Sequence, residues 1–569
     1  MTEDVKSGTT TSWFYCCPCF SWLSSNRVDG ALARARTRIG TLGVNARLHC
    51  FTRTLADDYT LSCDVLGKGF NGNVYVAHSK KSPGKFAVKS FRLSTICNED
   101  TKLVLNEVAI YLSIDHPHIV RLVDVYRGES SIDLVMECMG GGTVLKRVID
   151  RKRFTERDAV EAVWQMLLAL NYLHSLDIVH RDIKLENFLY ENKESSQLKL
   201  IDFGFSKIWN RCSRMRASCG TLQYVAPEVL EGSYTAQCDM WSLGVASFIL
   251  LTGKMPFGGQ RHRQISAIKS GQYNTNFPIW DRLSGDARNF INHLLVVNPQ
   301  VRYTPKGALH HAWVARRDES QASKTDIDKD IVYALQDYAH ASTFRRTVMY
   351  AMAWSLTNEE RNLLHDAFLE IDTDRSGTIS LGEFKQLLAA KFHLNDGVIQ
   401  EAFHQIDSNH SEQLEYSEFL AACASARIHF HKDLFVSTFR RFDDDDTGFI
   451  TADRLRQVIG PDECTLAEAS QMMLEADLNH DGKIPLGKFT EYLEETHRAG
   501  LEDDPLLPGK KTKDPSRPLY SGVHKKVSKL TNDLLQMEKQ NQPLQAVRAR
   551  TEAFRQHMAR PAGAFASQP

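Results

Sequence analysis

Apolar residues change their spacing along the chain, and the changes divide it into segments. Short apolar runs at 61–66 and 86–91 predict strands, whereas patterns from Glu156 onward repeat at helical spacing. We therefore expect a small strand-rich lobe and a larger helical lobe within residues 59–314. Residues 1–58 show neither period and predict an irregular, basic extension.

Apolar side chains recur at helical spacing between Ile331 and Trp354, within a junction segment that we place at 315–356. This pattern predicts one connecting helix. Further along, an acidic cluster with apolar flanks occurs four times, starting at Asp372, Asp407, Asp443 and Asp477, with separations of 35, 36 and 34 residues. Such an internal repeat predicts stacked units of one kind. We expect two paired helical lobes over 357–498.

The last segment, 499–569, starts as a linker rich in Pro, Lys and Asp and continues as a basic tail. Apolar residues from Val527 to Met537 form a basic amphipathic pattern, which Pro543 interrupts. We expect a solvated and largely unfolded tail, and the alternative is a tail that binds a partner or an anionic surface.

Composition narrows the class of protein. The 569 residues suffice for roughly four domains, and 42% hydrophobic with 24% charged residues is ordinary globular composition. A formal net charge of −1 argues against nucleic acid as a partner. The 12 cysteines show no framework spacing and no secretory signal, which predicts a reducing, cytoplasmic location. No apolar run approaches the roughly 20 residues of a membrane-spanning helix.

A glycine-rich motif follows the first predicted strand. Its three glycines allow the backbone to approach phosphate groups without obstruction by side chains. Lys89, on a predicted strand, supplies an ammonium for the phosphates, and Glu107, on a predicted helix, pairs with it. The predicted nucleotide-binding residues are Leu66, Gly67, Lys68, Gly69, Phe70, Asn71, Gly72, Asn73, Val74 and Lys89.

Residues His180 to Asn187 read His-Arg-Asp-Ile-Lys-Leu-Glu-Asn and match a phosphate-transfer catalytic loop. Asp202-Phe203-Gly204 and Ala226-Pro227-Glu228 follow in the expected order. On these motifs the chain resembles a protein kinase. The resemblance implies a bilobal α+β fold, ATP and Mg²⁺ as cofactors, and protein substrates.

The resemblance also implies residue roles. Asp182 would orient the substrate hydroxyl and accept its proton, Lys184 would neutralise the transferred phosphoryl group, and Asn187 and Asp202 would hold Mg²⁺. The further implied roles are Met136 behind the adenine, Glu137 and Met139 as hinge backbone groups, Glu228 as the partner of Arg302, and Asp239 as a brace of the catalytic loop. Lys184 and Gly220-Thr221 resemble serine/threonine rather than tyrosine kinases.

Two features depart from common relatives. Thr143 stands where relatives often carry a glutamate, so selection for an upstream arginine in substrates is not predicted. The segment from Gly204 to Gly220 contains three arginines but no acid to pair with Arg181. Either phosphorylation of Ser213 or Ser218 supplies the negative charge that would pair with Arg181, or the segment adopts its active conformation without modification.

The first two repeats predict calcium loops, because oxygen-bearing side chains fall at the ligand spacing and a glutamate closes each loop. The first loop, 372–383, offers Asp372, Asp374, Ser376, Thr378 and Glu383. The second loop, 407–418, offers Asp407, Asn409, Ser411, Gln413 and Glu418. Glu412 replaces the glycine of the sharp turn, so we expect weaker binding in the second loop.

The third and fourth loops, 443–454 and 477–488, end in Arg454 and Lys488 instead of the bidentate glutamate. A cation at this position removes two coordinating oxygens and opposes a metal ion. We therefore expect both loops to be structural partners rather than calcium sites.

Kinase motifs, a connecting helix and four such loops in this order resemble the calcium-dependent protein kinases, over about 440 of the 569 residues. The resemblance implies a kinase followed by an all-α calmodulin-like domain, with Ca²⁺ as a further ligand. It also implies that the helix at 331–354 blocks the catalytic cleft until calcium-loaded lobes withdraw it, a role that Arg345 and Arg346 suit. The alternative for this helix is a mere spacer. The alternatives for the protein are a nucleotide-binding scaffold without turnover and an active kinase with a structural EF-hand region.

Cys16, Cys17 and Cys19 lie in an aromatic-rich patch that S-acylation would attach to a membrane surface, with help from basic residues that follow. The alternative is a disordered tail without attachment. The chain starts Met1-Thr2, so the sequence has no N-myristoylation signal. We expect a monomer.

Overall fold

The computed structural model describes residues 28–502, except 51–52, 70–71, 81–83, 94–97, 212, 218, 320–328, 393–395 and 478. The predictions on Cys16, Cys17, Cys19, Phe70, Asn71 and Ser218, and those on the tail beyond 502, lie outside the described residues. The chain divides into two compact units, Met1–Glu494 and Glu495–Pro569.

The small lobe is a six-stranded sheet in the order β1-β5-β6-β4-β3-β2. Only the pairing of β1 with β5 is parallel among these neighbours. Val88 in the central strand is fully buried, as its place in an apolar run predicts. The elements are β1 (Leu48–Cys50), β2 (Tyr59–Gly69), β3 (Gly72–Ser79), β4 (Lys85–Arg92), α5 (Asn98–Ser113), β5 (Leu122–Arg127) and β6 (Ser131–Glu137).

The helical lobe is built around α7 (Glu156–Ser175) and α9 (Gln237–Thr252), which pack on each other. The Thr155 side chain accepts a hydrogen bond from the Asp158 amide and so starts α7, and Gly253, with φ of 69°, ends α9. The other elements are α6 (Val144–Arg151), β7 (Ile178–Val179), η2 (Leu185–Asn187), β8 (Phe188–Tyr190), β9 (Leu198–Leu200), β10 (Lys207–Ile208), α8 (Pro227–Leu230), α10 (Arg261–Ser270), α11 (Pro278–Asp281), α12 (Gly285–Leu294), α13 (Pro305–Leu309) and α14 (Ala312–Glu319).

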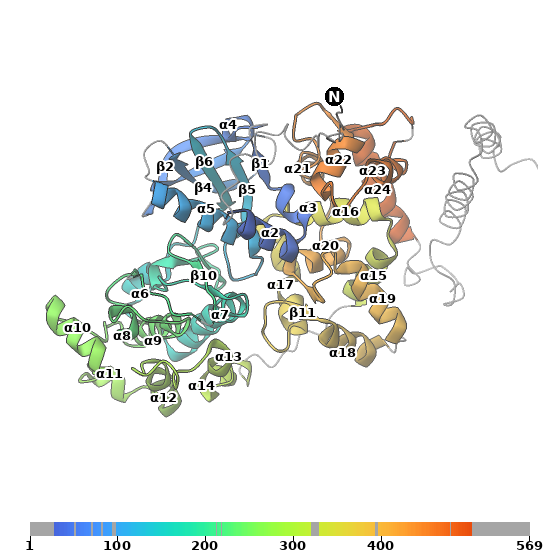
Figure 1. Ribbon diagram of the computed structural model, residues 1–569. Helices are drawn as coiled ribbons and strands as arrows, with labels where there is room; N and C mark the ends of the chain where they lie inside the picture. Colours follow the sequence, from blue (N-terminus) through green and yellow to red (C-terminus); the bar gives the residue numbers. More distant parts are fainter. Residues whose placement is uncertain are drawn as a thin grey trace, which may run out of the picture. The chain divides into compact units, whose positions relative to one another are not determined.

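The prediction of an irregular extension is wrong for residues 28–50 and 53–58. This segment forms α2 (Val28–Ile39), α3 (Thr41–Asn45), β1 and α4 (Leu55–Asp58). Helix α2 lies beside α5 (Figure 1) and buries Leu32, Ala35 and Ile39. These three positions share one helix face, but small and charged residues between them weaken the period, so the partner surface decides the fold.

The prediction of one connecting helix is also wrong. The junction forms two helices, α15 (Lys329–His340) and α16 (Thr343–Ala353). Ser342 breaks the pattern because its side chain accepts a hydrogen bond from the Arg345 amide and caps the second helix. Arg345 pairs with Asp337 at 3.1 Å, and Arg346 donates to the Ala339 and Ala341 carbonyls, so both arginines stabilise the turn.

Two pairs of helix–loop–helix units follow, as the repeat predicts. In the first pair Ile379 lies opposite Leu414, and in the second Ile450 lies opposite Ile484, each in a short antiparallel bridge. The elements are α17 (Asn358–Ile371), β11 (Ile379–Ser380), α18 (Leu381–Phe392), α19 (Asp396–Ile406), β12 (Gln413–Leu414), α20 (Tyr416–Arg427), α21 (Lys432–Phe439), β13 (Phe449–Thr451), α22 (Ala452–Ile459), α23 (Leu466–Met473), β14 (Lys483–Pro485) and α24 (Leu486–Glu502).

Both junction helices pack against the first of these lobes, chiefly on α20, and α15 also contacts α19. Helix α16 reaches further, to α21 and α23 of the second lobe and to α3. None of the helices in the described residues is both long enough and apolar enough to cross a bilayer.

Candidate active site and calcium loops

Lys89 stands at the centre of the candidate active site. Its Nζ lies 2.6 Å from the Glu107 carboxylate on α5 and 3.0 Å from the Asp202 carboxylate. Burial opposes the charged ammonium, but the two carboxylates outweigh burial and raise the pKa of Lys89. The same contacts hold the pKa of Asp202 below its usual value despite burial. The position of α5 therefore affects the charge at the nucleotide site, because α5 carries the Glu107 carboxylate that pairs with Lys89.

The residues of the predicted catalytic loop converge between β7 and η2. Lys184 Nζ lies 2.5 Å from Asp182 Oδ2, and Asn187 Nδ2 donates to the Asp182 backbone oxygen at 2.9 Å. The Thr221 hydroxyl donates to Asp182 Oδ1 at 3.0 Å. Asp239 accepts hydrogen bonds from the His180 and Arg181 amides at 2.9 and 2.8 Å, and so fixes the start of the loop.

The glycine-rich motif forms the tip of the β2–β3 hairpin. Gly67 lies opposite Val74, Lys68 opposite Asn73, and Gly69 opposite Gly72. Gly72 has a φ of 140°, and a Cβ there would lie 3.2 Å from the Ser90 carbonyl oxygen, so a larger residue would be strained. Leu66, just before the motif, is exposed.

The predicted hinge lies at the end of β6, where Met136, Glu137 and Met139 are all buried. The Glu137 carboxylate has a role that the sequence did not suggest: it accepts two hydrogen bonds from Lys199 at 2.8 Å and pairs with Arg361 of α17. The predicted hinge is thereby tied to α17, the first helix of the first helix–loop–helix pair.

Two other implied pairings can be compared with the structure. Arg302 lies 2.6 Å from Glu228, as the resemblance implied. Arg181 donates to the Phe205 carbonyl at 2.5 Å and to the Tyr234 hydroxyl at 3.3 Å. Within the described ranges no acid pairs with Arg181.

The first loop, 372–383, brings three acidic side chains close together. Oxygens of Asp372, Asp374 and Glu383 lie within 4.8 Å of one another. The two Asp372 oxygens also accept the Ser376 and Gly377 amides at 2.9 Å each, which folds the loop around them. The Thr378 hydroxyl donates to Gln413 of the second loop at 3.0 Å, so the two loops are coupled.

The second loop has the same form. Asp407 accepts the amides of Ser411 and Glu412 at 3.0 and 2.9 Å, and Glu418 accepts the Glu415 amide at 2.9 Å. Glu412 takes a φ of 62°, the left-handed conformation that glycine adopts without strain. The substitution is therefore accommodated at an energetic cost. The Asn409 side-chain nitrogen donates a hydrogen bond to the backbone carbonyl of Arg38 in α2.

The cations that close the late loops behave differently from each other. Arg454 turns into its own loop and contacts Asp445 at 2.7 Å. Lys488 instead contacts Glu491 on its own helix at 2.7 Å.

The sequence carries no motif for the contacts that join the two lobes to the helix–loop–helix region. Trp354 lies at the end of the junction, and the guanidinium groups of Arg47 and Arg121 lie over its ring at 3.7 and 4.1 Å from the centroid. Arg121 also donates to the Ala353 carbonyl at 2.9 Å, and Asp115 accepts the Ser417 amide at 2.5 Å. No local signal marks these residues, because each contact joins segments more than 200 residues apart.

Comparison with known proteins agrees with this geometry. A protein kinase domain model matches residues 61–314, and an EF-hand domain pair model matches residues 361–424. The chain is 34% identical to calcium-dependent protein kinase 3 of Plasmodium berghei, over 78% of this chain and 81% of that protein. It is 30% identical to calcium-dependent protein kinase 4 of Plasmodium falciparum, over 75% of this chain and 85% of that protein. The chain belongs to the calcium-dependent protein kinase family.

Proposed function

We propose that this protein is a calcium-regulated serine/threonine kinase that transfers the γ-phosphoryl group of MgATP to protein hydroxyls. The observation that carries the proposal is the 2.6 Å ion pair between Lys89 and Glu107, which phosphoryl transfer by protein kinases requires, with the Asp202 carboxylate 3.0 Å from the same ammonium. A scaffold without turnover would not need this ion pair together with the Asp182, Lys184 and Asn187 cluster.

The residues present fit a magnesium nucleotide. A Cβ at Gly67 would meet no atom within 4 Å, so the hairpin leaves open space for phosphates. Asn187 and Asp202 would hold Mg²⁺, which supplies positive charge for the phosphate oxygens. Lys89 fixes the nucleotide phosphates and Lys184 balances the transferred charge. Asp182 orients the substrate hydroxyl and takes its proton.

The first loop fits Ca²⁺, because three carboxylates converge there with hydroxyl and carbonyl oxygens nearby. The second loop fits it less well, because Glu412 holds a left-handed turn. Calcium in this lobe would stabilise the surface of α20 on which the junction helices pack. We propose that this surface competes with the catalytic cleft for the junction, so that calcium shifts the population toward the open cleft.

One observation favours a second reading, in which the EF-hand region is mainly a structural clamp. Arg454 and Lys488 close two of the four loops with cations, and the contacts of Glu137, Arg121 and Asp115 tie the region to the kinase. A calcium titration separates the two readings, because a clamp leaves activity independent of calcium.

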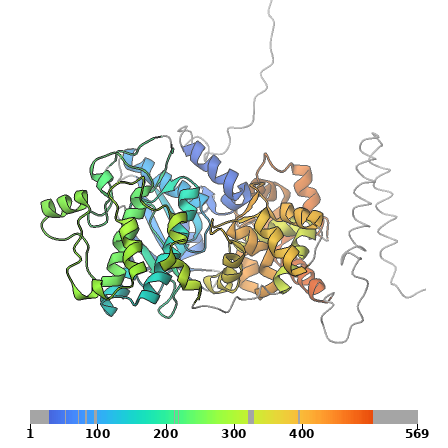
Figure 2. The ribbon, with the colours of Figure 1, turned by 90° about the horizontal axis from the view of Figure 1, so that it is seen from below.

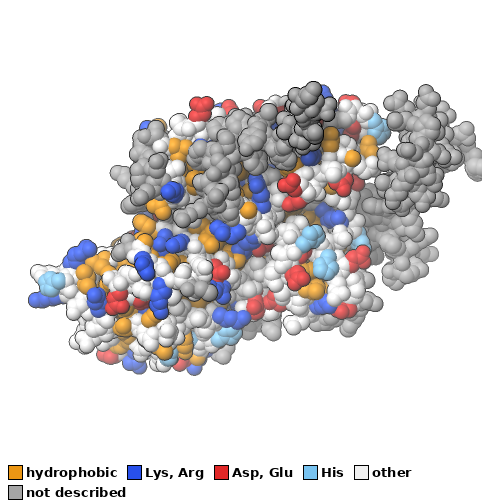
Figure 3. All heavy atoms as spheres, in the orientation of Figure 1, with side chains coloured by type: hydrophobic (Ala, Val, Ile, Leu, Met, Phe, Trp, Pro, Cys, Tyr) orange, Lys and Arg blue, Asp and Glu red, His pale blue; other side chains and the backbone are white. Residues whose placement is uncertain are grey.

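The substrates we propose are proteins, without a preference for an upstream arginine, because Thr143 replaces the usual acid. Figure 3 shows Lys and Arg side chains spread over the visible face of the catalytic lobes. We further propose a cytoplasmic monomer that S-acylation of Cys16, Cys17 or Cys19 attaches to membrane surfaces.

The test is phosphate transfer from ATP to a serine peptide by the full chain across a calcium titration. We expect activity to rise with calcium, and Asp182→Asn to lower it by about 10²- to 10⁴-fold at every calcium concentration. Glu383→Gln and Glu418→Gln should each move the midpoint to higher calcium. Equal activity in chelator and in saturating calcium would contradict calcium regulation, and full activity of Asp182→Asn would contradict the assigned site.

A further inference from the structure

The N-terminal helix α2 contacts both the catalytic lobe and a calcium loop. Its buried face, with Leu32, Ala35 and Ile39, belongs to the same core as Val104 and Val108 of α5, the helix that carries Glu107. In Figure 2 the dark blue N-terminal helices lie between the helices of the kinase and those of the EF-hand region. Any displacement of α2 would therefore act on the element that holds Lys89.

The chain after α2 also holds the end of α5. Arg47 is fully buried, and its guanidinium donates to the Leu112 carbonyl at 3.0 Å and to the Leu122 carbonyl at 3.2 Å. Leu112 lies in the last turn of α5, whose carbonyls have no partner within the helix. A cation at this end is favourable for the helix dipole. Residues 28–50 thus fix α5 along its side and at its end.

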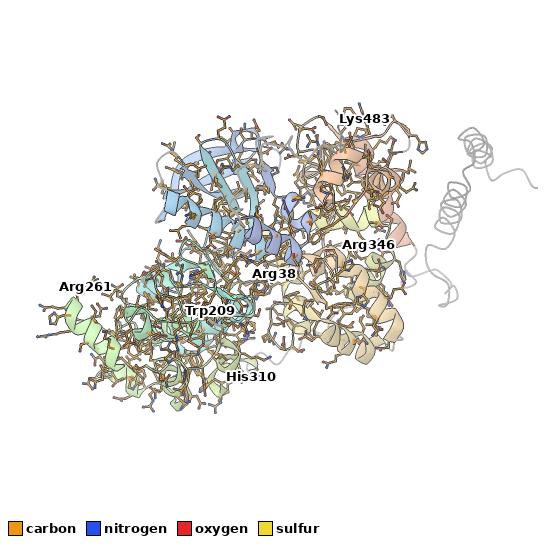
Figure 4. All side chains as sticks on the ribbon, viewed as in Figure 1. Arg38, Trp209, Arg261, His310, Arg346 and Lys483 are labelled. Carbon is orange, nitrogen blue, oxygen red and sulfur yellow. The ribbon has the colours of Figure 1, made fainter. Side chains whose placement is uncertain are left out.

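The other end of this connection is the second calcium loop. Arg38, labelled in Figure 4, lies at the last turn of α2 and places a guanidinium nitrogen 3.1 Å from the Glu415 carboxylate. Its side chain is 16% exposed and that of Glu415 is 4% exposed, so the ion pair is largely shielded from water. Tyr172 of the helical lobe donates to the other Glu415 oxygen at 3.2 Å, and its ring lies 4.8 Å from the Arg38 guanidinium.

The backbone of Arg38 contacts a second position of the same loop. The Asn409 side-chain nitrogen donates to the Arg38 carbonyl, while the Asn409 side-chain oxygen accepts the Ser411 amide at 2.9 Å. The end of α2 therefore orients the amide so that its oxygen faces the loop, where a ligand to calcium belongs. Asn409 and Glu415 occupy the third and ninth loop positions, and both contact the same residue of α2.

We propose that α2 couples calcium loading of the second loop to the position of α5, with Arg38 as the positioning residue. This inference rests on the proposed calcium-regulated kinase function. Calcium orders Asn409 and the residues around Glu415, these hold the end of α2, and α2 with Arg47 holds α5 where Glu107 meets Lys89. Arg38 contacts neither nucleotide nor substrate, and it acts through α5.

The test compares Arg38→Ala with Arg34→Ala and Arg38→Lys in the full chain. Arg34 is an exposed arginine one turn earlier on α2, so its variant removes the same charge without the Glu415 contact. We expect Arg38→Ala to raise the calcium concentration for half-maximal activity by at least about fivefold, with little change at saturation. Arg34→Ala should match the wild type, and Arg38→Lys should recover most of the effect because it keeps the charge.

A double variant separates coupling from simple stabilisation. In Glu418→Gln the second loop is disabled, so adding Arg38→Ala should cause no further shift of the calcium midpoint. Additive shifts, or a loss of activity at all calcium concentrations without a change in midpoint, would mean that Arg38 only stabilises the fold and would overturn the proposal. A calcium-dependent wild type with an unchanged Arg38→Ala midpoint overturns this inference alone, whereas a calcium-independent wild type overturns both it and the proposed regulation.

Discussion

The Arg454 guanidinium lies 2.7 Å from the Asp445 carboxylate, so the twelfth residue of the third loop binds the third residue of the same loop. In a calcium loop both positions would coordinate the metal ion. The Arg454 contact holds the pKa of Asp445 below its usual value, although partial burial opposes this. The Arg454 side chain thus places a positive charge inside the third loop, where a calcium-binding loop would hold the metal ion.

The first prediction follows from this contact. Arg454→Glu should create a calcium site in the third loop, because the change removes the internal cation and restores the bidentate carboxylate. Isothermal titration calorimetry should show one more bound calcium per chain than in the wild type. Lys432→Glu, at an exposed position on α21, is the control for the change in net charge. An unchanged stoichiometry in Arg454→Glu would show that other loop positions prevent binding.

The second prediction concerns Glu412, whose φ of 62° is unfavourable for a residue with a Cβ. Glu412→Gly should remove a strain of about 1 kcal/mol and so tighten calcium binding in the second loop by roughly fivefold. Calcium titration of the full chain, with Glu383→Gln present to silence the first loop, measures this affinity. Glu412→Gln serves as the matched control, since it removes the charge but keeps the strained backbone. Equal gains in both variants would assign the effect to charge.

The third prediction concerns Glu107, the buried partner of Lys89. Glu107→Gln should leave the Lys89 ammonium with Asp202 as its remaining carboxylate partner, and the loss of a buried ion-pair partner costs about 3–5 kcal/mol. We expect kcat/KM for ATP to fall by at least about 100-fold, because the ammonium no longer stays in position. Steady-state kinetics measure the change, and Glu129→Gln on the exposed β5–β6 turn provides the control. Wild-type kinetics in Glu107→Gln would contradict the assigned role.

The fourth prediction is a pH dependence at the contact between the small lobe and the third loop. His49 lies 3.2 Å from Asp124 and 2.6 Å from Asp444. Burial alone would lower the pKa of His49, but the hydrogen bonds to both aspartates outweigh it and raise the pKa to about 9. A raised histidine pKa contributes stability that is fully present below the unfolded value near 6.5 and is lost as pH rises through about 9.

This contribution amounts to about 3 kcal/mol in the free energy of unfolding. His49→Gln should therefore destabilise the protein more at pH 6 than at pH 10, as measured by denaturant unfolding at both values. His78→Gln, on an exposed side chain of β3, controls for loss of an ordinary histidine. The same destabilisation at both pH values would show that His49 contributes by packing rather than by charge.

Much of the candidate site was predictable because its motifs are local. Asp182, Lys184 and Asn187 lie within six residues, and each calcium loop spans twelve, so chain connectivity alone brings their atoms close. Lys89, Glu107 and Asp202 are distant in sequence, and their convergence was expected only from the resemblance to kinases. The residues that join the domains, such as Arg121, Trp354 and Arg361, carry no motif and were not expected.

The sequence by itself determined the order of the segments, the two-lobed kinase, the four loops and the cations that close the last two of them. These features depend on periodicity and on residue spacing, which act over one helix or one loop. Only the tertiary structure decided that residues 28–50 form helices and a strand, that the junction is two helices on α20, and that Arg454 binds Asp445. Helix α2 has a weak apolar period and requires the surface of α5, and Arg38 meets Glu415 across 377 residues of chain. The free energy of such contacts comes from burial and charge pairing between distant segments, which no local pattern records.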